Sequence, residues 1–165
     1  MLPCCDRLFH SAGECARLWK QLGCDYNVVQ ISPGPLHGRL RVDHQDGILL
    51  VSMQADQALL VEGTRHPRWL PFTIEHSDNY REHRHFGESL SPHTLAGFNT
   101  KMTETLMRTS PGGNCIGAVL VDRRRVDIWA DLMGAHEVSD RMEHNNKAIL
   151  SPMVHRKLRQ LMVLP

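Results

Sequence analysis

The sequence predicts an α+β protein that is mainly β, and the order of its elements is the first reason. A helical segment over residues 1–24 precedes a strand-rich middle over 25–121, and helices follow over 122–165. Because strands and helices do not alternate, a parallel β-α-β sheet is not expected. The strands are short and closely spaced, with turn residues between them, which is typical of a barrel or a sandwich. The length of 165 residues fits one domain.

The first helix is predicted from about Ala12 to Leu22. Ser11 can cap its first turn, and Glu14 follows three residues later, as in a capping box. Apolar side chains recur on one face of this helix at Cys15, Leu18, Trp19 and Leu22. Gly23 then marks the end of the helix.

The middle of the chain is predicted to contain a series of strands. They are Tyr26–Ile31, Arg39–Val42, Ile48–Met53, Ala58–Glu62, Trp69–Glu75, Thr94–Thr100, Glu104–Thr109 and Cys115–Val121. Asp46-Gly47 is typical of a tight hairpin turn, and the turn at Ser110–Gly113 is interpreted as a second hairpin. Trp69–Glu75 contains Pro71 and is therefore expected at a sheet edge. Cys115–Val121 is the most apolar run and is expected to be buried.

Two helix starts are marked in the last third of the chain. Asp122 can cap a helix that runs through Met133, and Ser151 followed by Pro152 marks the beginning of a terminal helix. The terminal helix carries an apolar stripe of Val154, Leu158, Leu161 and Met162. This stripe either packs against the domain or forms half of a contact between two copies.

Composition excludes several classes of protein. With 41% hydrophobic and 22% charged residues, the chain is neither a disordered tail nor a disulfide-rich miniprotein. The net charge of +1 predicts no direct binding of nucleic acid, and no window has the roughly 18 apolar residues of a membrane helix. The five cysteines form no C-x-x-C pair, and Met1–Asp6 lacks the features of a signal peptide, so we expect a cytoplasmic protein with reduced thiols.

Eleven histidines raise the question of a metal site. His83 and His85 would point to the same face of a strand, and Glu88 could add a carboxylate. This spacing resembles the first metal motif of cupins. One hypothesis is therefore a small metal-dependent enzyme that uses a divalent ion, and the other is a set of solvated loop histidines.

An arginine that faces a pocket is a candidate for binding a ligand carboxylate through two parallel N–H groups. The arginines scattered over predicted strands and turns are Arg39, Arg41, Arg65, Arg68 and Arg81. Serine nucleophile elbows and phosphate-binding loops are absent from the sequence, so no catalytic residue is predicted.

One stretch resembles a known family of regulators. Gln30–Leu40 reads QISPGPLHGRL and is similar to the Q-L-S-P-G-x-F-x-G-x-L segment of ethanolamine-operon-regulator-like, AraC-type transcriptional regulators. Asp56–Gly63, Trp69–Phe72 and the Ser110–Gly113 turn resemble later parts of the same N-terminal sensor domain, over roughly residues 20–163. The sequence contains no counterpart of the family's DNA-binding domain.

This resemblance implies a cupin-like antiparallel β-barrel that binds a small molecule, followed by helices that hold a homodimer together. We therefore predict a non-enzymatic sensing and dimerisation domain, with no cofactor outside the metal-dependent alternative. The ligand would lie inside the barrel. Trp69 and Phe72 are the candidate wall residues, and Arg39 or Arg41 is the candidate arginine.

Overall fold

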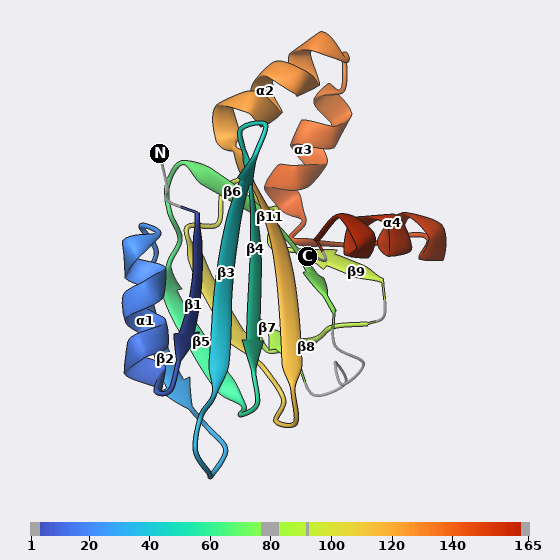
Figure 1. Ribbon diagram of the computed structural model, residues 1–165. Helices are drawn as coiled ribbons and strands as arrows, with labels where there is room; N and C mark the ends of the chain where they lie inside the picture. The colour runs from blue at the N-terminus through green and yellow to red at the C-terminus, as the bar shows by residue number, and fades with distance from the viewer. Residues whose placement is uncertain (1–3, 77–82, 92, 163–165) are drawn as a thin grey trace.

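The described residues form two antiparallel β-sheets and four helices (Figure 1). The computed structural model describes residues 4–76, 83–91 and 93–162. In order, the larger sheet contains β1 (Cys5–Phe9), β3 (Gly38–Gln45), β4 (Ile48–Ala55), β11 (Asn114–Asp122), β6 (Trp69–Glu75), β9 (Thr94–Ala96) and β12 (Lys147–Ile149). The smaller sheet contains β2 (Asp25–Gln30), β5 (Leu59–Thr64), β10 (Glu104–Arg108), β7 (Arg84–His85) and β8 (Glu88–Ser89). The predicted fold class, α+β and mainly β, is confirmed.

The main hydrophobic core lies between the two sheets. Each strand alternates its side chains between two faces, so one face of each sheet is turned toward the other sheet. Leu40 and Met53 from the larger sheet pack in one buried cluster with Leu59 and Val61 from the smaller sheet. The ladders between described strands run within each sheet, and closure into a single barrel is not seen among them.

Helix α1 (Ala12–Gln21) forms where its capping residues predict it. The Ser11 hydroxyl accepts a hydrogen bond from the Glu14 amide at 3.2 Å, and the Glu14 carboxylate accepts one from the His10 amide at 2.6 Å. The apolar face of the helix buries Cys15 in the main core. The helix lies beside β1 and β2, along one side of the two sheets (Figure 1).

The hairpin of β3 and β4 confirms the predicted tight turn. Asp46 and Gly47 both have positive φ angles, of 49° and 79°, as a two-residue hairpin turn of this kind requires. Gln45 pairs with Ile48 across the turn. The Arg125 side chain donates a hydrogen bond to the Asp46 carbonyl at 2.7 Å. This bond joins the hairpin to the helix that begins at Arg123.

Two predictions about strand pairing in the middle of the chain are wrong, and the strand predicted over Thr94–Thr100 ends at Ala96. Strand β6 is not an edge strand, because it lies between β11 and β9. It pairs with β9 only at Thr73 and Ile74, so Pro71 stands where one side of β6 has no ladder among the described strands,. The Ser110–Gly113 turn closes no hairpin, because β10 belongs to the smaller sheet and β11 to the larger one.

The C-terminal third contains helices α2 (Arg123–Leu132), α3 (His136–His144) and α4 (Pro152–Met162). The Asp122 carboxylate accepts from the Arg124 amide at 3.0 Å, and the Ser151 hydroxyl accepts from the Val154 amide at 3.3 Å, so both predicted helix starts are confirmed. This segment also contains β12, which the purely helical prediction for 122–165 missed. Helices α2 and α3 project beyond the sheets (Figure 1). None of the described helices is long and apolar enough to cross a membrane.

Candidate ligand-binding cavity

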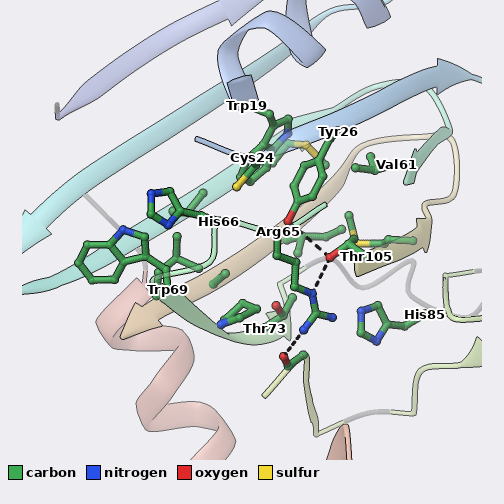
Figure 2. Close-up of a pocket in the computed structure, with 18 residues that line it drawn as sticks. Trp19, Cys24, Tyr26, Val61, Arg65, His66, Trp69, Thr73, His85 and Thr105 are labelled. Carbon is green, nitrogen blue, oxygen red and sulfur yellow. Dashed lines mark hydrogen bonds between the residues drawn. The ribbon is translucent and has the colours of Figure 1, made fainter. Parts of the chain in front are cut away.

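A cavity of about 80 Å³ lies between the two sheets, close to α1 (Figure 2). Its wall on the larger sheet includes Ile116, Ala118 and Leu120, which are alternate residues of β11 and therefore share one face,. Ala118 is the smallest of these three side chains and leaves room between its neighbours. The other apolar and aromatic lining residues are Trp19, Tyr26, Val51, Met53, Val61, Trp69, Pro71 and Met107.

Arg65 brings a positive charge into this apolar space. It follows β5 directly, and only 4% of its surface is exposed. Its Nε donates to the Thr105 hydroxyl at 2.9 Å, and its Nη1 donates to the Gly97 carbonyl at 2.7 Å; Figure 2 shows both bonds. Its Nη2 is buried and has no hydrogen-bond partner among the described residues. Both partners of the guanidinium are neutral, so neither compensates its charge.

The remaining polar groups of the cavity are neutral at pH 7. Burial lowers the pKa of His85 to about 4, and the nearby charge of Arg65 adds to this effect. Burial raises the pKa of Tyr26, whose hydroxyl lies 3.4 Å from the Thr105 hydroxyl. Burial also lowers the pKa of His66. Arg65 is therefore the one charged side chain among the described residues that line the cavity.

His85 stands between this cavity and two others. A small extension of about 10 Å³ shares His85 and Thr73 with the main cavity and is also lined by His83 and Glu75. A hollow of about 230 Å³ is lined by His85 together with Phe86 and residues of the segment 144–147. His85 is therefore a lining residue of all three spaces.

The structure brings one of the four predicted ligand residues to the cavity. Trp69 lines it. Phe72 is not among the lining residues and stacks on Phe98, with ring centroids 6.1 Å apart. Arg39 forms an ion pair with Asp6 of β1, and its Nε donates to that carboxylate at 2.6 Å.

Arg39 and Arg41 lie outside the cavity because of the strand alternation on β3. Leu40 and Val42 are buried in the core between the sheets, so their neighbours on the strand point the other way. The arginine in the cavity is Arg65, one of the five arginines that the sequence made candidates. Of the others, Arg81 lies outside the described residues.

The three metal-ligand candidates have separate surroundings. The fully buried His83 hydrogen-bonds through its ring to Glu75. His85 lines the cavity, and the Glu88 carboxylate pairs with Lys147. Within residues 4–76, 83–91 and 93–162, no three histidine, cysteine or acidic side chains gather as a metal site would require.

Comparison of the chain with protein-family models, with curated proteins and with solved structures finds no match. The resemblance to AraC-type sensor domains therefore stays a prediction from the sequence.

Proposed function

We propose that this chain is a non-enzymatic domain that binds and senses a small molecule between its two sheets. The observation that carries this proposal is the mainly apolar cavity with one buried, incompletely bonded arginine. Apolar hollows with a few polar groups are typical of sites for small molecules. One water-sized atom takes about 10–15 Å³ of such a space, so about 80 Å³ accommodates roughly six non-hydrogen atoms.

A neutral probe of that size tests the cavity. Trp19 and Trp69 both line it, so their fluorescence should change when pentan-1-ol is titrated into the protein. The Ala118→Leu variant adds three carbon atoms to the wall and takes about half of the room. We expect this variant to bind pentan-1-ol more weakly than the natural protein by about tenfold or more.

Val119→Leu is the matched control, because Val119 is the next residue of β11 and its side chain lies on the opposite face,. This control should bind pentan-1-ol as the natural protein does. Equal affinity of the Ala118→Leu variant and the natural protein would contradict binding in this cavity.

We further propose that the partner is a second copy of this chain, held through the C-terminal helices, among which α2 carries an exposed apolar stripe. Apolar side chains of α2 and its C-cap residue stand in pairs four residues apart and form one exposed stripe,. The pairs are Ile128 with Leu132, and Trp129 with the C-cap Met133. Leu132 is 78% exposed. An exposed apolar stripe of this kind is typical of a surface that another chain covers.

Sedimentation velocity tests this partner. We expect the natural protein to be a dimer and Leu132→Glu to be a monomer, because the new charge would be buried in the contact. Leu8→Glu is the control, since Leu8 of β1 is also exposed, at 69%, and lies outside the C-terminal helices. A natural protein that stays monomeric at high concentration would contradict the proposal.

The proposed setting is the cytoplasm, with no direct contact to nucleic acid and no cofactor. Five free cysteines support a reducing compartment,. The net charge of +1 supports the absence of a nucleic-acid surface on this chain.

A further inference from the structure

We propose that the ligand of the cavity is a short apolar carboxylic acid, bound as its carboxylate by the Arg65 guanidinium. This inference rests on the proposed function, because it requires that the cavity holds a small molecule. It adds the chemical class of that molecule and the residue that selects it.

The first argument is the charge of Arg65. A buried cation is costly unless an anion or several hydrogen bonds compensate it. No aspartate or glutamate is among the described residues that line the cavity. The guanidinium of Arg123 has the same sign as Arg65 and adds to the lowering of the Arg65 pKa that burial causes. An anionic ligand would supply the missing compensation.

The second argument is the direction in which Arg65 can still bind. Thr105 and Gly97 occupy its Nε and one N–H of Nη1, while Nη2 has no partner among the described residues. The free edge of a guanidinium offers parallel N–H groups that match the two oxygens of a carboxylate. In Figure 2 the guanidinium reaches into the lining beside His85.

The third argument separates a carboxylate from a phosphate. A phosphate group carries about 1.5 to 2 negative charges and three strongly accepting oxygens. The cavity has one charged side chain among its described lining residues, and most of the others are apolar or aromatic. A single charge with a compact head group therefore fits better, and the apolar body would lie against Ala118, Trp69 and Val61.

Three five-carbon probes test the inference: pentanoate, pentan-1-ol and pentyl phosphate. Each has five carbon atoms, and the head groups differ; in pentanoate one of the five is the carboxylate carbon. We expect the natural protein at pH 7.5 to bind pentanoate more tightly than pentan-1-ol by about tenfold or more, because charge-assisted hydrogen bonds are the stronger ones. Pentyl phosphate should bind more weakly than pentanoate, because its head group is both larger and more highly charged than a carboxylate. Isothermal titration calorimetry gives all three affinities.

Variants of Arg65 test whether this residue causes the preference for pentanoate over pentan-1-ol. Arg65→Met should bind pentanoate no better than pentan-1-ol. Arg65→Lys should keep only part of the preference for pentanoate, because lysine has the positive charge but lacks the paired N–H groups of a guanidinium. Arg7→Met is the matched control, since Arg7 is an exposed arginine on β1, and it should behave as the natural protein does. If Arg65→Met fails to fold, the comparison of probes on the natural protein still decides the matter.

The outcomes separate this inference from the proposed function. Equal affinities for pentanoate and pentan-1-ol would overturn the carboxylate and leave a ligand-binding cavity. Binding of pentyl phosphate at least as tight as that of pentanoate would also overturn the choice of head group. A natural protein that binds none of the three probes would overturn both the inference and the proposed function.

Discussion

Replacing Phe9 by alanine is expected to lower the free energy of unfolding by about 3–5 kcal/mol, the usual cost of removing a buried aromatic ring. Phe9 is fully buried at the end of β1. It pairs with Gly38 across the ladder with β3. A Cβ atom on Gly38 would lie 2.1 Å from Cζ of Phe9, so the ring lies directly over the glycine. Deleting the ring would leave a hole that the backbone of two strands cannot readily close.

Urea unfolding followed by circular dichroism measures this loss as a shift of the midpoint. Leu8→Ala is the matched control on the same strand, because Leu8 is 69% exposed. Its effect should stay within about 0.5 kcal/mol. If Phe9→Ala cost no more than Leu8→Ala, Phe9 would not belong to the core as described.

Lowering the pH from 7 to 4 is expected to destabilise the fold by about 4 kcal/mol. The pKa values of His85 and His76 are lowered to about 4, mainly by burial. Arg65 adds to the shift of His85, whereas Glu88 opposes it; the charges of Arg159 and His155 add to the shift of His76.

The direction of the effect follows from where the protons bind. Below about pH 6.5 an unfolded chain protonates these histidines, whereas the folded chain does so only near pH 4. The unfolded state therefore binds more protons in this window, and stability falls with pH. For His85, the lowering of the pKa from 6.5 to about 4 corresponds to about 3 kcal/mol of stability,. For His76, which is less buried, solvent screens the charge, and the loss is about 1 kcal/mol,.

Urea unfolding at pH 7, 5.5 and 4 measures this loss. The His85→Gln variant cannot take up the proton, so its free energy of unfolding should fall less between pH 7 and pH 4 than that of the natural protein. Equal stability of the natural protein at pH 7 and pH 4 would contradict the burial of these rings.

The elements that the sequence predicts well are those specified by neighbouring residues. Ser11 with Glu14 caps α1, Asp46-Gly47 turns the β3–β4 hairpin, and Asp122 begins α2. Each signal lies within a few residues of the structure it forms. The position of β6 inside the sheet and the crossing of Ser110–Gly113 between sheets depend instead on strands far away in the sequence.

Three elements have no local signal strong enough to predict them. Strand β1 is held by its ladder with β3, which lies about thirty residues later in the chain, and it buries only Phe9. Strand β12 has three exposed residues and pairs with β9. Helix α3 has no side chain that caps its first turn. Burial patterns this weak give no periodicity to detect.

The cavity could be predicted in part. Trp69 lies in a predicted strand, which makes it a candidate wall residue, and it lines the cavity. Arg39 and Arg41 alternate with Leu40 and Val42, and assigning those two to the core would have placed both arginines outside. Arg65 stands just after a strand, where alternation no longer says which way a side chain points, so only the assembled sheets identify it.

Strand β11 continues directly into helix α2, with no loop between them. Ile116, Ala118 and Leu120 touch the cavity, and Asp122, the last residue of the same strand, is already the cap of the helix. The helix of ten residues extends about 15 Å. A tilt of about 5° in the strand would therefore displace the far end of α2 by roughly 1 Å, so a ligand that tilted β11 would also move the exposed side chains of that helix.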